Sequence, residues 1–213
     1  MDVLGLIRYH TRTTMKTFNP DRNIGYETKK SYKDKIDSGF MAKYFSGDLV
    51  LEIGHQGGET GRDPIVEWAI GIDLDYPGYD GIHLPFEDLS VDTIYSSHCF
   101  EHMENLDAVL NEWYKKLKFG GYIVIVVPHQ YLYEKKLSPP SRYNPYHFHF
   151  FTPGKLLQVI ETYLPMNGFR LRHLQDNDKD FDYYLPAYQH SSGCYEIELV
   201  IQKIKRPEYT DHM

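Results

Sequence analysis

The sequence of 213 residues has few cysteines and lacks a long apolar run. Its two cysteines, Cys99 and Cys194, are too few for a disulfide framework, so a reducing compartment is the expected environment. No stretch approaches the ~20 consecutive apolar residues of a membrane-spanning helix, and the apolar patch within residues 1–8 is too short for the h-region of a signal peptide. We therefore expect a cytoplasmic protein with no membrane partner.

The chain also lacks an excess of basic residues. Its formal net charge is −7 at pH 7. Sequence-independent binding to a phosphate backbone depends on a basic surface, so nucleic acid is not expected as a partner. The lysines of residues 29–43 are interleaved with Asp34 and Asp37, a pattern typical of a solvated helix face.

Hydrophobic residues make up 41% of the chain and charged residues 25%, as in ordinary globular proteins. The length suits one domain with a sizeable core, so we predict a single domain over residues 1–213. Tyrosine is unusually frequent, at 19 residues. Tyrosine rings serve equally well as half-buried packing groups and as binding surfaces for a polar ring, so their positions have to decide between the two uses.

The order of apolar segments predicts an α/β fold. Helical spacing occurs in residues 31–44, 106–117 and 153–163, whereas short apolar runs predict strands at 49–53, 69–72, 93–97, 122–127, 169–174 and 195–202. Strands that alternate with helices form a mostly parallel, Rossmann-like sheet with helices on both faces. No helical pattern separates the last two strands, so one of them is expected to be antiparallel.

Three segments depart from this regular alternation of strands and helices. Residues 1–30 are predicted to form an N-terminal arm, apart from the helix that follows, and residues 64–67 leave room for only a short helix. The connection from Asp73 to Leu84 is too short for a full helix and strand, which predicts a shortened second crossover and a sheet truncated at one edge. An exposed sheet edge could support a homodimer.

A glycine-rich bend follows the first predicted strand, from Gly54 to Gly58, and Asp73 ends the second strand nineteen positions after Gly54. Glycines let the backbone approach a ligand closely, and an acid at the end of the second strand can accept hydrogen bonds from ribose hydroxyls. The pattern therefore predicts a nucleoside site. The order Gly54-His55-Gln56-Gly57 breaks the dinucleotide fingerprint G-x-G-x-x-G and disfavours a dinucleotide.

Four segments occur in a familiar order. They are Leu51-Glu52-Ile53-Gly54-x-x-x-Gly58, then Gly71-Ile72-Asp73, then Leu84-Pro85-Phe86 continuing through Ser96-Ser97-His98-x-x-Glu101-His102, and finally Phe119-Gly120-Gly121 through Pro128. Over residues 48–174 this arrangement resembles the class I S-adenosylmethionine-dependent methyltransferases, in particular the methyltransferase type 11 group.

The resemblance implies a seat for S-adenosylmethionine. The glycine bend with Glu52 and His55 would lie under the methionine part, Asp73 and Leu74 would hold the ribose, and the stretch from Asp80 through His83 and Leu84 would flank the adenine. Ser96, Ser97 and His98 would lie beside the methionine amino group and the sulfonium. The cofactor-binding residues implied in this way are Glu52, Gly54, His55, Gly58, Asp73, Leu74, His83, Leu84, Ser96, Ser97 and His98. The chain departs from the family at Gln56, which replaces the usual second glycine, and Asp80 is equally compatible with a turn.

Methyl transfer to a hydroxyl benefits from a positioned base, worth ~10²–10⁴-fold. His98 and His129 follow adjacent central strands, where an acceptor has to lie, and are the candidate catalytic residues. His102 is expected to pack or orient its loop. His147-x-His149 has the spacing of a metal pair, but no acid lies close in sequence, so no metal is expected.

The acceptor is expected to contact two loops, residues 128–152 and 175–194. In the first loop the candidate substrate-binding residues are Tyr131, Tyr133, Arg142, Tyr146, His147 and His149. Tyrosine and histidine suit a hydroxylated ring such as a sugar, whereas the aspartates of the second loop suit an amine or form a solvated acidic loop. Long loops in compact domains are usually functional or disordered.

We therefore predict a methyltransferase for a small polar acceptor, namely a hydroxyl of a sugar, sugar nucleotide or glycan precursor. Two alternatives remain at this point. One is a non-catalytic binding or regulatory module that keeps the cofactor fold, which the substitution at Gln56 and the short crossover favour. The other is an N-methyltransferase of an amine or a protein.

Overall fold

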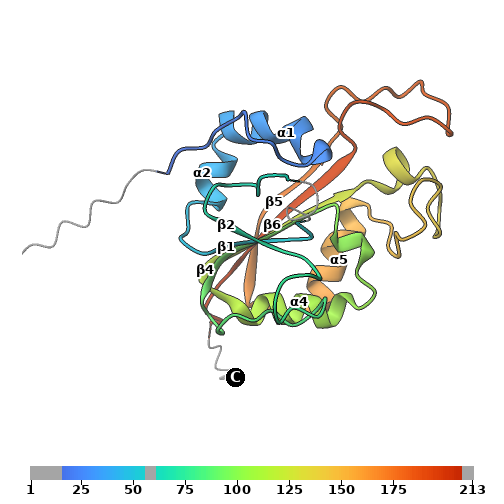
Figure 1. The fold of residues 1–213 in the computed structure, drawn as a ribbon. Coiled ribbons are helices and arrows are strands. Elements are labelled where there is room, and N and C mark those ends of the chain that lie inside the picture. Colours follow the sequence, from blue (N-terminus) through green and yellow to red (C-terminus); the bar gives the residue numbers. More distant parts are fainter. Residues whose placement is uncertain (1–15, 56–60, 208–213) are drawn as a thin grey trace, which may run out of the picture.

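The computed structural model describes residues 16–55 and 61–207. These residues form a six-stranded sheet of order β2-β1-β3-β4-β6-β5. The first four strands are parallel, and β6 is antiparallel to both of its neighbours, β4 and β5. The predicted mostly parallel α/β sheet is therefore confirmed (Figure 1). The strands are β1 Val50–Ile53, β2 Ala69–Ile72, β3 Val91–Ser97, β4 Leu117–Pro128, β5 Phe169–Asn177 and β6 Glu196–Lys203.

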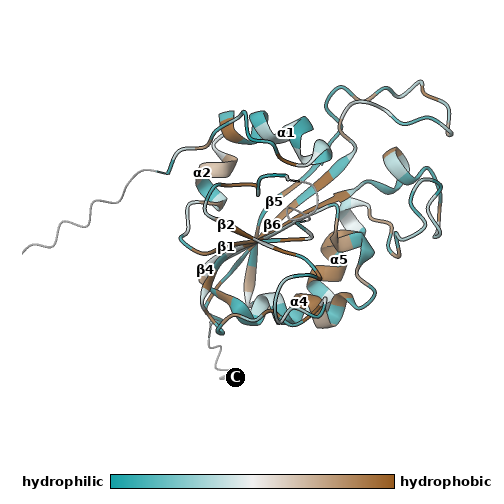
Figure 2. Cartoon of the chain, in the orientation of Figure 1, coloured by the Kyte–Doolittle hydropathy of each residue, from teal (hydrophilic) through white to brown (hydrophobic). Residues whose placement is uncertain are grey.

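Helices cover both faces of the sheet (Figure 1). On one face α4 (Leu106–Lys116) and α5 (Pro153–Tyr163) pack against the odd-numbered residues of β4, for example Ile123 and Ile125. On the other face α1 (Tyr26–Asp37) and α2 (Phe40–Tyr44) pack against even-numbered residues such as Val124. Because both faces of the sheet are buried, residues 123–127 of β4 form an unbroken apolar run, and Figure 2 shows hydrophobic segments along the strands.

The helix boundaries follow local chemistry. Thr152 caps α5 by accepting a hydrogen bond from the Lys155 amide, and Pro153 occupies the first turn, as the sequence predicts. The prediction of one helix over residues 31–44 is wrong in detail. The helix begins at Tyr26, inside the predicted arm, and it breaks at Gly39, whose φ of 77° lies in the left-handed region that favours glycine.

The predicted short crossover is confirmed, because residues 73–90 contain no helix and no strand between β2 and β3. In the described part of the chain β2 is therefore an edge strand, and pairing with a second copy at this edge stays a prediction. The short helix expected at residues 64–67 is a turn instead, closed by a hydrogen bond from the Ala69 amide to the Val66 carbonyl. No helix within the described ranges is both long and apolar enough to cross a bilayer.

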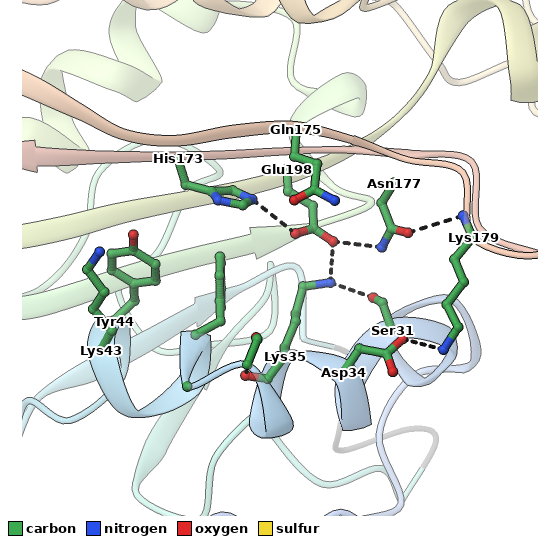
Figure 3. Close-up of a pocket in the computed structure, with 13 residues that line it drawn as sticks. Ser31, Asp34, Lys35, Lys43, Tyr44, His173, Gln175, Asn177, Lys179 and Glu198 are labelled. Atoms are coloured by element: carbon green, nitrogen blue, oxygen red, sulfur yellow. Dashed lines mark hydrogen bonds and ion pairs between the residues drawn. The ribbon is translucent and has the colours of Figure 1, made fainter.

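A buried ion pair fixes α1 against the C-terminal strands (Figure 3). Lys35 Nζ lies 2.7 Å from Glu198 Oε1, and Asn177 and His173 also contact this carboxylate. Burial alone would raise the pKa of Glu198, but these partners outweigh it and lower the pKa to about 2. Most of the charges that line the cavity of about 420 Å³ beside this pair have partners: Lys35 and His173 pair with Glu198, and Lys179 pairs with Asp34. We therefore assign this region to the scaffold.

The bend after β1 depends on a close approach. Gly54 has a φ of +86°, and a Cβ added there would lie 2.5 Å from both Cβ and Sγ of Cys99, which follows β3. Neither the conformation nor the space admits a side chain. Glycine at this position therefore lets the ends of two neighbouring strands come together.

Glu52 supports the segment that leads into β2. Its Oε2 accepts a hydrogen bond from the Ile65 amide, and its side chain is 14% exposed. Burial raises the pKa of Glu52 to about 7, although the Ile65 amide and the charge of Arg22 act in the opposite direction. This carboxyl is therefore protonated in the folded protein over a pH range in which it would ionise in the unfolded chain.

Substitution of Gly54 by alanine is expected to lower the free energy of unfolding by about 2–4 kcal/mol, because it combines backbone strain with an overlap against Cys99. Urea denaturation measures the change. Gly154→Ala in α5 is the matched control, since an added Cβ meets nothing within 4 Å there. Equal stability of the two variants would contradict the packing argument.

Replacement of Glu52 by glutamine is expected to change how stability depends on pH. The wild-type protein should lose stability as the pH rises from 4.5 to about 7, because the unfolded chain releases the proton before the folded chain does. The neutral amide avoids this loss, so Glu52→Gln should be more stable than wild type at pH 8, by roughly 2 kcal/mol, and nearly equal to it at pH 5. Denaturation curves at both pH values test this. The exposed Glu67→Gln is the control, and a gap that does not change with pH would refute the prediction.

Candidate functional site

A cavity of about 650 Å³ lies at the carboxyl ends of β1, β2 and β3. This is the switch point of the sheet, where the chain leaves β1 for β2 and then returns to the other side of β1 as β3. Ligands of open α/β sheets bind at this position, and the volume suits a small molecule. The lining residues are Gly54, Asp73, Leu74, Tyr79, Asp80, Gly81, Ile82, His98, Cys99, His102, Met103, Glu104, Asn105 and Val109.

Asp73 and Leu74 line the cavity where β2 ends, as the sequence predicts for a ribose contact. Asp73 Oδ1 accepts a hydrogen bond of 2.7 Å from the Leu74 amide, which orients the carboxylate. Tyr79 is buried on the neighbouring turn, and its hydroxyl donates to the Gly81 carbonyl. The cavity therefore has one acidic wall beside an aromatic one.

The stretch predicted to flank an adenine divides into two parts. Residues 80–82 line the cavity, whereas His83 and Leu84 do not. Asp80 accepts hydrogen bonds from the Ile82 and His83 amides and pairs with His83 Nδ1 at 2.8 Å, so it also closes its own turn. Leu84 is buried in the core, and its amide donates to Glu112.

Of the residues predicted around the glycine bend, Gly54 lines the cavity and the other described ones do not. Gly58 lies outside the described residues. His55 lies over β2 instead, because a Cβ on Gly71 would come within 2.2 Å of its ring. Glu52 holds the Ile65 amide and does not line the cavity.

His98 lies at the end of β3 and lines the cavity. Its φ of +50° is unusual for a residue with a side chain and places the ring beside the buried Glu196, with Nε2 3.0 Å from Glu196 Oε1. Burial alone would lower the pKa of His98, but the carboxylates of Glu196, Glu101 and Glu27 outweigh it and raise the pKa. An orienting acid behind one ring nitrogen leaves the other nitrogen to accept a proton.

Ser96 and Ser97, predicted beside the cofactor, do not line the cavity. Ser96 is fully buried, and Ser97 Oγ lies 3.2 Å from Thr28 Oγ1 on the α1 side of the sheet. Their position in the strand directs them into the packing of the sheet, and His98 is the first residue past the strand to reach the cavity.

His129 has a structural role at the end of β4. Its Nδ1 accepts hydrogen bonds from the Tyr131 and Leu132 amides and caps a π-helical turn, η2 (Gln130–Glu134). Its Nε2 lies 3.5 Å from Asp176, and burial lowers the pKa of the ring. His129 does not line the cavity, so the geometry favours His98 as the candidate base.

The two loops predicted to contact a substrate meet each other. The ring centroids of Tyr143 and His190 are 3.6 Å apart, and Tyr133 lies 4.9 Å from His190. Lys135 Nζ donates to the Gln189 carbonyl at 2.7 Å. Figure 1 shows both loops projecting from the same end of the sheet.

None of the six predicted substrate residues lines the cavity. Tyr131, Arg142 and Tyr146 are exposed. Tyr133 stacks on the buried His147 at 5.5 Å. His149 Nε2 lies 2.9 Å from the carbonyl oxygen of Met103, a lining residue, and thus joins this loop to the cavity wall.

Sequence reasoning missed several residues that the structure gathers at this site. Tyr79, Met103 and Asn105 line the cavity together with Cys99, which the sequence already places in the segment after the third predicted strand. The buried acids Glu101 and Glu196 lie beside the cavity-lining His98, and the buried Glu134 pairs with His147. Glu101 belongs to the recognised Glu101-His102 segment, but nothing in the sequence separates a functional acid from a packing one. Glu134 comes from the π-helical turn η2 and Glu196 from the start of β6.

Comparison with known proteins supports the resemblance to methyltransferases that the sequence motifs indicate. Residues 62–125 match the methyltransferase domain of the type 11 group. A probable S-adenosylmethionine-dependent methyltransferase from Mycolicibacterium smegmatis is 28% identical over 140 residues, which cover 57% of this chain and 53% of that protein. The chain thus spans about half the length of this curated relative.

Solved structures share the fold. A putative methyltransferase from Bacillus halodurans has a TM-score of 0.52 at 15% identity, over 81% of this chain and 100% of that one. An S-adenosylmethionine-dependent methyltransferase from Archaeoglobus fulgidus has a TM-score of 0.51 at 19% identity, over 84% and 98%. The putative enzyme from Listeria monocytogenes has a TM-score of 0.52 at 16% identity, over 83% and 100%.

The family match, the relative and the shared fold agree with the motifs that line the cavity. The chain is therefore similar to S-adenosylmethionine-dependent methyltransferases in residues 62–125 and shares the fold of solved methyltransferase structures.

Proposed function

We propose that this protein transfers a methyl group from S-adenosylmethionine to a hydroxyl of a small polar acceptor, namely a sugar, sugar nucleotide or glycan precursor. The observation that supports this proposal is the presence of Asp73 and His98 on the wall of one cavity. An acid suited to ribose hydroxyls and a histidine suited to proton transfer would thereby lie around the same small molecule.

The described residues fit the cofactor. The cavity of about 650 Å³ is large enough for a nucleoside with a side chain, and Gly54 avoids the overlap with Cys99 that a larger residue would make. Asp73 would accept hydrogen bonds from the ribose hydroxyls, as its carboxylate already does from the Leu74 amide. The aromatic face of Tyr79 and the apolar side chains of Ile82 and Val109 would pack against the remainder.

Bound S-adenosylmethionine supplies an activated methyl group that a nucleophile displaces directly. The protein's own contribution is alignment, which removes entropy before the reaction, and removal of the acceptor proton. Glu196, buried and 3.0 Å from His98 Nε2, would orient the imidazole. The proton would then reach Nδ1, the ring nitrogen that lies 4.0 Å from the buried Glu101 Oε1. Without a base a hydroxyl is a poor nucleophile, so this pair favours an oxygen acceptor.

The acceptor class is inferred from the loops beside the cavity. Five tyrosines that are more than half exposed lie on the two loops: Tyr131, Tyr146, Tyr183, Tyr184 and Tyr188. Such rings offer an apolar face with a hydrated hydroxyl, which suits a polar ring such as a sugar. The contact of His149 with Met103 connects this surface to the cavity.

Asp73→Ala is expected to weaken binding of S-adenosylhomocysteine roughly 10–100-fold, because hydrogen bonds to a charged group contribute about 1.5–3 kcal/mol. Isothermal titration calorimetry gives the dissociation constants. Asp75→Ala, which removes an exposed acid two residues away, is the matched control and should keep the wild-type affinity. Unchanged affinity in Asp73→Ala would remove Asp73 from the cofactor site.

Turnover tests the reaction and the base together. A screen of sugar nucleotides, free sugars and amines, followed by release of S-adenosylhomocysteine, should show activity with a hydroxyl acceptor. His98→Gln should then lower kcat by ~10²–10⁴-fold while affinity for S-adenosylhomocysteine stays within a few-fold. His129→Gln should affect stability more than kcat, because His129 caps η2.

Other outcomes of the screen would reject the proposal in distinct ways. Turnover of amines alone would identify an N-methyltransferase. Absence of affinity for both S-adenosylmethionine and S-adenosylhomocysteine would favour a non-catalytic module. Full activity of His98→Gln would exclude His98 as the base.

A further inference from the structure

A buried carboxylate next to the cavity-lining His102 has no hydrogen-bond partner within the described residues. Glu101, in the 3-10 turn η1 (Phe100–His102), is 0% exposed, and neither of its carboxylate oxygens makes a hydrogen bond within the described residues. A buried charge without compensation is strongly unfavourable, and buried polar atoms are nearly always satisfied. Either a proton or a bound cation therefore has to compensate the Glu101 carboxylate at this point.

Three imidazole nitrogens face the same oxygen. From Glu101 Oε1, His147 Nε2 lies at 3.8 Å, His102 Nε2 at 3.9 Å and His98 Nδ1 at 4.0 Å. These separations are too long for hydrogen bonds. Around a tetrahedral Zn²⁺ with bonds of about 2.0–2.1 Å, neighbouring ligand atoms are about 3.4 Å apart. The ligand atoms of Glu101, His102 and His147 lie within 4.8 Å of one another, so a small contraction would bring all three onto one ion.

The outer nitrogens of two of these histidines are already occupied. His147 Nδ1 lies 2.5 Å from the buried Glu134 Oε1, and His102 Nδ1 lies 3.0 Å from the Tyr146 carbonyl oxygen. A hydrogen bond at Nδ1 places the proton there and leaves Nε2 as a lone pair directed at Glu101. Histidines that bind metals are held in this way, by a carboxylate or a carbonyl on the far nitrogen.

We propose that Glu101, His102 and His147 form a binding site for one divalent transition-metal ion, and that this ion is Zn²⁺. Two imidazoles and one carboxylate are a donor set that zinc accepts, with water in the fourth position. Harder ions such as Mg²⁺ prefer oxygen ligands and fit these nitrogens less well. The sequence expectation of no metal considered His147 with His149, but His149 contacts Met103 and the partner of His147 is His102, 4.6 Å away ring to ring.

The ion would join two loops that are distant in sequence. Glu101 and His102 follow β3, whereas His147 belongs to the long loop after β4. Backbone bonds from the Phe148 and His149 amides to the Glu101 carbonyl already hold the two loops together. A metal bridge between them would fix the wall of the cavity, which His102 lines. This inference does not depend on the proposed reaction, since it concerns binding of the ion alone.

Calorimetry on untagged protein tests the site. The full chain is freed of metal with a chelator, dialysed and titrated with Zn²⁺, and one ion per chain with a submicromolar dissociation constant is expected. His147→Ala and His102→Ala should each weaken binding at least 100-fold. His149→Ala is the matched control, because it removes the other histidine of the same His-x-His pair and should bind as wild type does.

Two further measurements separate a metal site from a structural role. Glu134→Gln should weaken Zn²⁺ binding roughly 10–100-fold although Glu134 is not a ligand. Zn²⁺ should raise the melting temperature of wild type and His149→Ala but not of His147→Ala, since only a folded state with the site gains from the ion. Co²⁺ in place of Zn²⁺ should give visible absorption bands of a four-coordinate site.

Three results would overturn the proposal. They are no Zn²⁺ binding tighter than millimolar by the wild-type chain, unchanged affinity in both His102→Ala and His147→Ala, and equal weakening by His149→Ala. Circular dichroism identifies any variant that fails to fold. In that case Glu134→Gln and the conservative Glu101→Gln, which keeps the shape of the side chain, carry the test.

Discussion

The close approach of Gly54 to Cys99 is the contact on which the site depends. It brings the segment after β1 against the segment after β3 at the carboxyl edge of the sheet, and both residues line the cavity. A parallel sheet buried on both faces exposes ligand-binding backbone only at such an edge. The helices, the core and the C-terminal strands serve to hold this edge in place.

Acids buried beside histidines are the second organising feature. Glu196 pairs with His98, and Glu134 pairs with His147. The Glu101 carboxylate lies near three imidazoles and makes no hydrogen bond to any residue that the structure describes. Each carboxylate pays a desolvation cost that only a nearby positive or protonated partner offsets. Such concentrations of buried ionisable groups are typical of functional sites, and here they lie directly behind the cavity wall.

Much of the fold was predictable because its signals are local. The apolar runs identified all six strands, and Thr152-Pro153 identified the start of α5. The short connection after Asp73 identified the shortened second crossover. Gly39 was not recognised as a break, since a glycine inside a helical pattern is often tolerated. The π-helical turn after β4 was also missed. His129 caps this turn, and the sequence does not distinguish a capping histidine from a catalytic one.

For the site, the sequence by itself determined which segments end at the ligand edge, because strand direction and glycine placement follow from local pattern. It therefore located Gly54, Asp73 and His98. Only the tertiary structure decided which side chains share a wall, since that depends on register and on contacts between residues far apart in the chain. Glu196 reaches His98 because β6 lies antiparallel beside β4, and His147 reaches Glu101 because the long loop folds back over η1. Packing across the sheet, which no local pattern encodes, makes those pairs.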